Sequence, residues 1–543
     1  MERLILLLHL FLGMTCLAAT PALDGFYPAG GPRGSTNRVT ATGKSDVWPP
    51  NVWIAGDGLE FAAETNKGIF TVRIAATAAP GPRLVRLYNE EGSSDPRVFV
   101  IGETREVTEI EPNNHYAKPQ RLESLPAPTP PAEGGAGWGE EDRQNQKLPL
   151  SPILPRGERK KSGAVSESAR SSITLNGRLD KSGDVDSFAI HLRAGDWLVA
   201  RVDCYVLMSK VDAVLRLVTT NGQQLAWNHD FITLDPRLAW QAPTEGDVVL
   251  QLFGFAFPPD SGITLTGGDS AVYRLHVAVT NAEPAIGGVP TEHEPNNTLE
   301  TAEPIELPAE IKGAIGVHGD EDRFRFSLKK NETLDARIDA ASFGSPLDAW
   351  LKIEDSSGKT LAQNDDVEGA RDPRLEWKAP TNGVFVIVIG SVTHRGGRDY
   401  GYRLSLQRAL PDFTATLASG TLELIPGKTN ELKLEVKRLR GFTNDLAVRV
   451  RGLPGEITVL TARVPKDGSM PIRFAATADA PKFQGPIQFY LFDTVTQRER
   501  LVSFDLTTRG ETGFNHLLVE TADHFWLTVR PKAEPEKKDK PSK

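Results

Sequence analysis

The sequence predicts an all-β protein, a linear array of four β-sandwich domains. Two observations support this fold class. Apolar and polar residues alternate along most of the 543-residue chain, as Phe324, Phe326 and Leu328 do with Arg and Ser, and a period of two is typical of strands that bury one face. In addition, a block in the middle of the chain occurs twice. Long helical patterns are absent, so sandwiches built from short strands fit best.

Residues 1–20 are predicted to be a secretory signal peptide. An apolar run, Leu4–Leu12, follows a short basic region and precedes the small residues Ala18 and Ala19. Lipid modification of Cys16 is the weaker alternative, because the preceding residues match a lipobox poorly. We therefore expect the protein to be secreted, to the extracellular space, the periplasm or the cell surface.

The bulk composition limits the partners. The formal net charge of −9 argues against nucleic acid. No segment after the leader offers the roughly 18 consecutive apolar residues that a membrane span needs. After cleavage Cys204 has no cysteine to pair with, and its phase within an alternating run predicts a small buried hydrophobic residue.

Residues 23–103 are predicted to form an immunoglobulin-like β-sandwich. They open with the Gly- and Pro-rich stretch Tyr27–Gly31 and then alternate. The predicted strands are Arg38–Thr42, Leu59–Ala63, Ile69–Ile74, Gly81–Tyr88 and Arg97–Ile101. This number of short strands in so few residues is typical of a small sandwich.

The duplicated block begins with Glu-Pro-Asn-Asn, at Glu111–Asn114 and at Glu294–Asn297. Gly-Asp-x-Asp-x-Phe, Asp-Pro-Arg-Leu-x-Trp and Tyr-Arg-Leu then follow in the same order in both copies. Asn221-Gly222 and Ser357-Gly358 occupy matching places between strands and predict hairpin turns. Two copies of one domain are therefore predicted, which suits binding or spacing better than catalysis.

The first copy contains an insertion. The two copies differ in numbering by 136 or 137 from the paired aspartates to the Trp, but by 183 at Glu-Pro-Asn-Asn. About 47 additional residues therefore fall within residues 124–171. This segment is rich in Pro, Gly, Glu, Lys and Ser and lacks apolar periodicity, so we predict a disordered surface loop.

Residues 411–530 are predicted to form a second immunoglobulin-like sandwich. Leu432, Leu434 and Val436 alternate with charged residues, a second alternating run follows, and Gly452–Gly455 predicts a turn. The remaining residues, 531–543, mix Lys, Glu and Pro and are predicted to be a disordered tail.

The combination of motifs in the duplicated block resembles the bacterial pre-peptidase C-terminal domain family. The resemblance covers about residues 107–280 and 290–408. It implies a jelly-roll-like β-sandwich that accompanies secreted peptidases, and some members, in clostridial collagenases, bind calcium and collagen. The peptidase itself has no counterpart in this sequence.

Oxygen-bearing side chains alternate at two places in each copy. Glu109, Glu111 and Asn113 occupy alternate positions, so an extended backbone would place them on one face. The two aspartates of Gly-Asp-x-Asp also share a face, and like charges so close repel unless a cation separates them. Calcium takes six to eight oxygen ligands in irregular geometry.

In the calcium-binding members of the family the ligands come from these two segments. The resemblance therefore implies two Ca²⁺ sites, formed by Glu109, Glu111, Asn113, Asp184 and Asp186 in the first copy and by Glu292, Glu294, Asn296, Asp320 and Asp322 in the second. The alternative is that these are solvated turn residues whose side chains cap loops.

Aromatic residues offer a second class of candidate. Trp240 and Trp377 share one repeat position and are predicted to lie in the core, with stacking on carbohydrate as the alternative. Phe253, Phe255 and Phe257 alternate in the first copy and are also predicted to be core, with an exposed binding edge as the alternative.

A further acidic loop occurs at Asn228–Asp230 and Asn364–Asp366. A polar hairpin loop is favoured there over a metal site. Hydrolase motifs such as Gly-x-Ser-x-Gly and His-Glu-x-x-His are absent, so we expect no enzyme.

The sequence as a whole predicts a secreted, monomeric, non-catalytic modular protein that binds extracellular protein or polysaccharide. Two alternatives remain open. The chain is an accessory or a remnant of a secreted peptidase system, or its repeats are carbohydrate- or collagen-binding modules.

Overall fold

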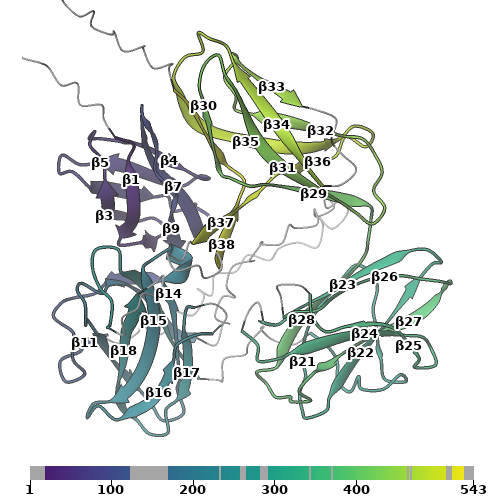
Figure 1. Cartoon of the computed structure of the whole chain (residues 1–543). Coiled ribbons are helices and arrows are strands. Elements are labelled where there is room, and N and C mark those ends of the chain that lie inside the picture. Colours follow the sequence, from purple (N-terminus) through teal and green to yellow (C-terminus); the bar gives the residue numbers. More distant parts are fainter. Residues whose placement is uncertain are drawn as a thin grey trace, which may run out of the picture.

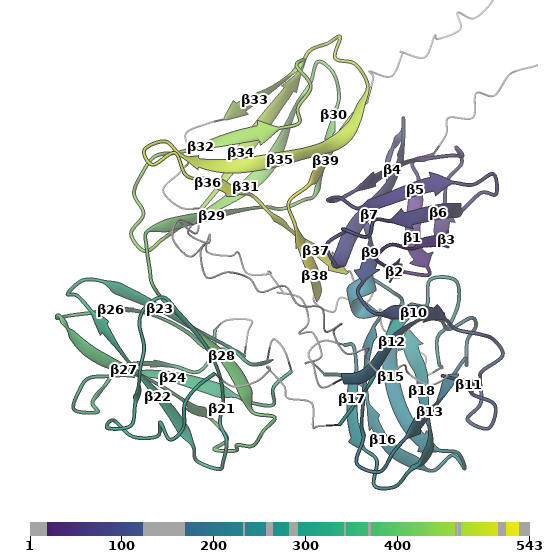
Figure 2. The same cartoon turned by 180° about the vertical axis from the view of Figure 1, so that it is seen from behind.

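The computed structural model describes residues 19–122, 169–231, 234–256, 264–281, 291–341, 344–367, 371–461, 464, 468–508 and 517–530. Strands dominate, together with the 3₁₀ helix η1 (Tyr205–Leu207). They form successive β-sandwiches (Figures 1 and 2), so the predicted all-β fold class is confirmed. The predicted leader, except its last two residues, and the predicted tail lie outside the described residues. So does the predicted insertion up to residue 168, whereas its last three residues begin a strand.

The first domain packs two sheets, β1-β3-β6-β5 and β2-β9-β7-β4, with β8 on β7. Its strands are β1 (Ala22–Tyr27), β2 (Gly30–Pro32), β3 (Thr36–Lys44), β4 (Asn51–Ile54), β5 (Leu59–Ala63), β6 (Ile69–Ile74), β7 (Gly81–Asn89), β8 (Gly92–Ser93) and β9 (Arg97–Gly102). The five predicted strands correspond to β3, β5, β6, β7 and β9. The strands β1, β2, β4 and β8 were not predicted, because Gly or Pro lies within β1, β2 and β8 and two prolines directly precede β4.

The second domain has the sheets β10-β12-β19-β14-β17 and β11-β13-β18-β15-β16. Its strands are β10 (Arg105–Thr108), β11 (Gln120–Arg121), β12 (Ala169–Arg178), β13 (Asp186–Leu192), β14 (Trp197–Asp203), β15 (Val211–Thr219), β16 (Gln224–Asn228), β17 (Arg237–Gln241), β18 (Gly246–Ala256) and β19 (Val272–Thr280). Cys204 follows β14 and is fully buried, as predicted.

The third domain has the sheets β21-β28-β23-β26 and β20-β22-β27-β24-β25. Its strands are β20 (Glu303–Pro304), β21 (Ala309–Ala314), β22 (Glu321–Leu328), β23 (Thr333–Asp339), β24 (Ala349–Glu354), β25 (Thr360–Asn364), β26 (Arg374–Lys378), β27 (Gly383–Ser391) and β28 (Gly401–Arg408). Among the described residues the strand order matches that of the second domain apart from β10, whose counterpart positions 288–290 are not described, so the sequence repeat is a repeat of topology. Gly222 and Gly358 both have φ of 84° in the predicted hairpin turns.

The fourth domain has the sheets β29-β31-β34-β33 and β30-β39-β35-β32, with β36 on β35, and a separate hairpin β37-β38. Its strands are β29 (Asp412–Leu417), β30 (Thr421–Leu424), β31 (Thr429–Leu439), β32 (Leu446–Arg451), β33 (Ile457–Thr461), β34 (Gly468–Ala476), β35 (Phe483–Asp493), β36 (Glu499–Leu501), β37 (Phe504–Thr508), β38 (Leu517–Ala522) and β39 (Phe525–Val529). The predicted turn at residues 452–455 lies between β32 and β33.

The predicted core aromatics divide into two groups. Trp240 and Trp377 are half-buried and pack against the cores of the second and third domains, as predicted. The prediction is wrong for Phe255, which is 38% exposed. The phase of β18 explains the error, since Leu250 and Leu252 point into the core and the Phe positions therefore point out. Phe253 is half-buried on that outer face beneath a guanidinium, and Phe257 lies outside the described residues.

The first and fourth domains, which are farthest apart in sequence, contact each other (Figures 1 and 2). The ring of Trp526 on β39 lies 6.0 Å from that of Trp53 and 5.0 Å from that of Tyr88. Lys482 pairs with Glu90 at 3.0 Å. The four domains follow one another along the sequence, and this contact brings the two ends of the array together.

Candidate metal centres

In both repeats the same backbone contact attaches the Glu-Pro-Asn-Asn segment to the start of a strand. The amide N–H of Ser187 on β13 donates to the carbonyl of Asn113 at 3.1 Å. The N–H of Arg323 on β22 donates to the carbonyl of Asn296 at 3.1 Å. These bonds bring the acidic residues before the motif next to Asp186 in one copy and Asp322 in the other.

In the first site, carboxylate oxygens of Glu109, Glu111 and Asp186 lie within 4.8 Å of one another. A tyrosine for which the sequence predicted no role connects two of these carboxylates. The hydroxyl of Tyr273 lies 2.8 Å from Glu109 Oε2 and 2.7 Å from Asp186 Oδ2. The amide of Arg178 donates to Glu109 Oε1 at 2.6 Å.

The second site repeats this arrangement. Carboxylate oxygens of Glu294, Asp320 and Asp322 lie within 4.8 Å of one another. The hydroxyl of Tyr402 lies 2.8 Å from Glu292 Oε2 and 2.7 Å from Asp322 Oδ2. Tyr402 belongs to the same Tyr-Arg-Leu motif as Tyr273. The motif marked the repeat in the sequence, but nothing in its spacing showed that its hydroxyl reaches the acidic residues.

Corresponding buried atoms lack hydrogen-bond partners in both sites. These atoms are the side-chain amide O and N of Asn113 and Asn296, and Oδ1 of Asp186 and of Asp322. All four residues are 0% exposed. A buried polar atom without a partner costs about 1–3 kcal/mol, and carboxylate and amide oxygens are the ligands that Ca²⁺ prefers. The residues present therefore fit a calcium ion.

Burial makes these carboxyls hard to ionise. It raises the pKa of Asp186 to about 10 and that of Asp322 to about 9, with the charge of the neighbouring glutamate as the next cause. Burial also raises the pKa of Glu109 to about 7 and that of Glu292. Without a cation, protons must neutralise part of each site. A divalent cation would replace them.

Not all predicted ligands lie in the clusters. Asp184 Oδ2 accepts from the amide of Asp180 at 2.7 Å, and its Oδ1 accepts from the Asn114 side chain. Asp320 makes equivalent bonds to the Gly316 amide and to the second Asn of its own motif. Such bonds are expected if these aspartates cap loops, which is the alternative to metal binding. Asp320 nevertheless lies within its cluster, whereas Asp184 and Glu292 lie outside theirs.

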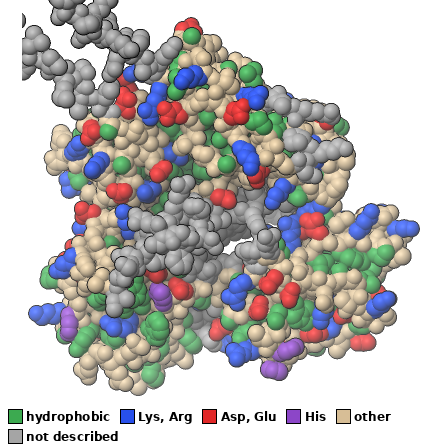
Figure 3. Space-filling model, in the orientation of Figure 1, with side chains coloured by type: hydrophobic (Ala, Val, Ile, Leu, Met, Phe, Trp, Pro, Cys, Tyr) green, Lys and Arg blue, Asp and Glu red, His purple; other side chains and the backbone are tan. Residues whose placement is uncertain are grey.

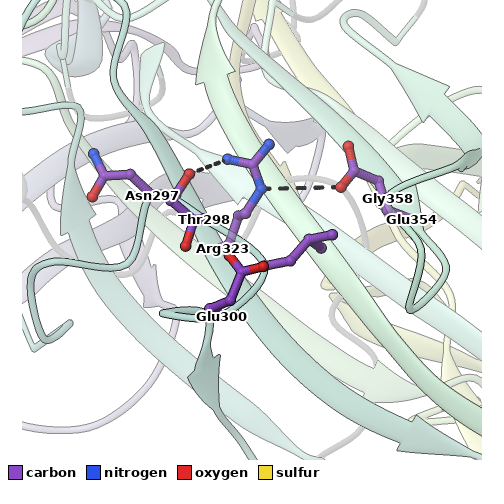
Figure 4. A pocket seen from close by; sticks show the side chains of 7 residues that line it. Asn297, Thr298, Glu300, Arg323, Glu354 and Gly358 are labelled. Atoms are coloured by element: carbon purple, nitrogen blue, oxygen red, sulfur yellow. Dashed lines mark hydrogen bonds and ion pairs between the residues drawn. The ribbon is translucent and has the colours of Figure 1, made fainter.

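A cavity of about 340 Å³ lies behind the loop of the second site (Figure 4). It is lined by Asn297, Thr298, Leu299, Glu300, Arg323, Glu354 and Gly358. Arg323 points into it, donates to the carbonyl of Asn297 at 2.5 Å and lies 4.0 Å from the carboxylate of Glu354. Since Asn297 in turn bonds to Asp320, Arg323 positions this side of the site.

The polar loop after β16 forms a third cluster. His229 Nε2 lies 3.2 Å from Asp212 Oδ1, and its Nδ1 lies 3.7 Å from Asp230. The imidazole is about one-third exposed, and its ring centroid lies 6.3 Å from that of the exposed Phe255. Trp227, two residues earlier in the chain, is 60% exposed. The facing atoms Asp212 Oδ1 and His229 Nε2 are buried and make no hydrogen bond, and the three side chains offer ligand atoms within 4.8 Å of one another.

Thr174, His276 and Asp203 form a chain that resembles a catalytic triad. His276 Nδ1 lies 2.9 Å from Thr174 Oγ1, and its Nε2 lies 2.7 Å from Asp203 Oδ2. Thr174 is 2% exposed, however, and its hydroxyl also bonds to Thr104 at 3.0 Å. We interpret the chain as a structural network between β12, β14 and β19.

No helix in the described part of the chain is long and apolar enough to cross a bilayer. No family model matches the chain. A 102-residue stretch is 34% identical to part of a probable subtilase-type serine protease of Deinococcus radiodurans, and the match spans 18% of this chain but only 14% of that protease.

Several solved structures are weakly similar to this chain. The pre-peptidase C-terminal domain of a collagenase from Bacillus anthracis is 15% identical, with a TM-score of 0.17, over 21% of this chain and all of its own. The periplasmic lysozyme inhibitor PliG of Aeromonas hydrophila is 15% identical, with a TM-score of 0.14, over 20% and 97%. The N-terminal four Ig domains of Dscam1 are 9% identical, with a TM-score of 0.18, over 94% and 100%. With such low scores, nothing about ligands transfers to this chain.

The fold therefore defines the class as a multi-domain β-sandwich protein. Within this class, the particular feature of the chain is the pair of matching acidic sites in its two middle domains.

Proposed function

We propose that the chain is an exported, non-catalytic modular protein whose two middle domains are pre-peptidase C-terminal-type domains stabilised by calcium. The repeated motifs and the repeated strand order support the domain assignment. The apolar N-terminal run supports export. Acidic and basic side chains are interspersed on the face that Figure 3 shows, which suits an extracellular protein or a polysaccharide as partner better than nucleic acid.

The observation that carries the calcium proposal is the set of buried oxygens without hydrogen-bond donors, repeated in both sites. In the first site Glu109, Glu111, Asn113 and Asp186 would hold the ion. In the second the ligands would be Glu294, Asn296, Asp320 and Asp322. The ion supplies positive charge that links the Glu-Pro-Asn-Asn segment to the following strand. It is a structural ion in this proposal.

Thermal unfolding of the full chain in calcium, magnesium or chelator tests the proposal. An ion that binds only the folded state stabilises it by RT ln(1 + [L]/Kd), which is about 2.7 kcal/mol at a hundredfold excess over Kd. Magnesium should stabilise less, because it demands tight octahedral geometry and gives up water reluctantly. Glu294→Gln combined with Asp322→Asn should remove the contribution of the second site.

The exposed Glu300→Gln, in the same loop, is the matched control and should retain the full calcium response. If the double variant responds to calcium as the wild type does, these carboxylates are not ligands, and the loop-capping alternative holds.

The binding partner would be an extracellular protein or a polysaccharide. Trp227, 60% exposed, and Phe255, 38% exposed, each offer an apolar contact on the second domain. A screen of the full chain against glycans and matrix proteins, repeated with Trp227→Ala, tests this. Assays on casein, gelatin and polysaccharides should stay at background, and turnover abolished by one point substitution would contradict the non-catalytic assignment.

A second candidate is an accessory role in a secreted peptidase system. The 34% identity to part of a subtilase-type protease favours it. Adding the purified chain to secreted subtilases should then change their activity or substrate preference. Unchanged kinetics, together with a hit in the binding screen, would favour the first candidate.

A further inference from the structure

A residue of the first domain reaches into the acidic site of the second domain. The hydroxyl of Tyr27, at the end of β1, lies 3.1 Å from Glu109 Oε1. The guanidinium of Arg178 lies over the Tyr27 ring, 4.8 Å from its centroid. Glu109 thus has three partners, its own domain's Arg178 amide and Tyr273 hydroxyl, and the hydroxyl of Tyr27.

The surrounding junction is packed and mostly buried. Ala29 and Val98 of the first domain form an apolar cluster with Leu207 and Val272 of the second. A Cβ on Gly30 of β2 would lie 2.0 Å from a guanidinium nitrogen of Arg274. The first domain therefore docks closely against the second domain, at the junction where Tyr27 reaches Glu109.

The second site provides the comparison. Glu292 corresponds to Glu109 and receives equivalent bonds, from the Ala314 amide at 2.8 Å and from the Tyr402 hydroxyl at 2.8 Å. Among the described residues, none from a neighbouring domain bonds to Glu292. β10 connects the first domain to Glu109, and of its counterpart positions in the third domain, residues 288–291, the structure describes only Thr291.

We propose that the first acidic site is a two-domain cation site, in which Tyr27 of the first domain positions Glu109 as a ligand. This inference rests on the proposed calcium binding. Asn113 is fully buried and its side-chain amide has no hydrogen-bond partner, which is an independent indication of a ligand there. A partner that orients a liganding side chain raises metal affinity. Cation binding and domain docking are then coupled, and the coupling is reciprocal.

The test uses the full chain in two backgrounds. Asp322→Asn removes the second site, so calcium binding in that background reports on the first site. Asp186→Asn removes the first site, so binding there reports on the second site. Calorimetric titration with calcium should show that Tyr27→Phe weakens binding about tenfold in the Asp322→Asn background. The same change should leave binding in the Asp186→Asn background unaltered.

A second variant and a second readout protect the test from misfolding. Val98→Ser loosens the apolar junction without touching a ligand, and it should weaken the first site in the same way. Hydrogen exchange should show that calcium protects β1 and β10 in the wild type but not in Asp186→Asn. Equal calcium affinity with and without the Tyr27 hydroxyl, in a folded protein, would overturn the coupling. Absence of calcium binding in both backgrounds would instead overturn the proposed function.

Discussion

Asp186 and Asp322 are the residues on which the two acidic sites depend. Each is fully buried, each shares a tyrosine hydroxyl with a glutamate, and each has one oxygen without a donor. Burying ionised carboxylates costs several kcal/mol unless they are paired or bound to a cation. The stability of both repeats should therefore depend on which positive charge, a proton or a metal ion, neutralises them.

The pKa of Asp322, raised by burial to about 9, predicts a pH dependence. Because the folded pKa lies above the unfolded value of about 3.9, this proton stabilises the fold fully below about pH 4. That stability is lost as pH rises towards 9, by up to roughly 1.4 kcal/mol per pH unit. In chelator the melting temperature should fall between pH 5 and 9. Calcium should flatten this decline, and parallel curves with and without calcium would contradict the prediction.

Asp322→Asn should have two opposite effects. The amide needs no neutralising charge, so the variant in chelator at pH 8 should melt higher than the wild type. It should also lose the calcium response of the second site. A control at the exposed Glu300 should show neither effect, and a variant less stable than wild type in chelator would mean that the carboxylate makes a contact the amide cannot replace.

The Cys204 thiol should be unreactive in the folded protein. Complete burial raises its pKa well above the usual value, and the thiolate is the reactive form. A thiol reagent at pH 8 should label it in denaturant but not in buffer. Rapid labelling of the native chain would show that the second domain opens easily.

At this scale alternation predicted that Glu109 and Glu111, and Asp320 and Asp322, share a face, but it did not predict that Asp184 and Glu292 lie outside the clusters. It did not predict the roles of Tyr27, Tyr273 and Tyr402, since their hydroxyls reach the sites from strands distant in sequence. The prediction for Phe255 was wrong because apolar residues occupy both faces of β18, so alternation alone does not show which face is buried.

At the scale of elements, the two repeats differ in the length of one connection between strands. The third domain connects β20 to β21 through four residues, whereas the corresponding strands of the second domain, β11 and β12, are separated by residues 122–168. Both domains nevertheless show the same order of their shared strands, and each has an acidic cluster that includes the equivalent pair Glu111 and Asp186 or Glu294 and Asp322. The repeat therefore folds in the same way with or without the additional residues.

Replacing residues 122–168 by the four residues 305–308 should leave the second domain folded. Each halving of a connection reduces the entropic cost of closing it by about 0.6 kcal/mol, so stabilisation on the order of 2 kcal/mol is the upper expectation. Calcium titration in the Asp322→Asn background checks that the first site survives. Loss of binding in a folded protein would show that the insertion contributes to the site.

The sequence predicted β3, β5, β6, β7 and β9 of the first domain but missed β1, β2, β4 and β8. Propensity and alternation carry the signal of a strand, and Gly and Pro weaken it where the chain makes close contacts. Gly30 is one such position, since its missing side chain admits Arg274. Residues that build the junction between domains therefore obscured the strands that contain them.

At the scale of the whole molecule, an aromatic contact between Trp53, Tyr88 and Trp526 joins the first and fourth domains. Aromatic pairs contribute about 0.5–1.5 kcal/mol beyond the area that they bury. The exposed ion pair of Lys482 with Glu90 adds little. Nothing in the sequence predicted this contact, because it joins residues more than 400 positions apart that share no pattern.

Trp53→Ala should open the arrangement. Removing the ring deletes its contacts with Trp526 and His524, so the end domains should separate, and small-angle X-ray scattering should show a larger radius of gyration. Trp227→Ala, on an exposed ring of the second domain, is the control and should not change the radius. An unchanged radius for Trp53→Ala would show that the remaining contacts suffice.

The contact between the end domains also decides how the molecule responds to tension. Ala19, at the start of the described chain, accepts a hydrogen bond from Asn89, which lies beside the Lys482–Glu90 pair, and Trp526 is four residues from the end of the last described stretch. A force applied through the two ends would therefore load this contact first. The middle domains, with their acidic sites, would bear the load only after this contact breaks.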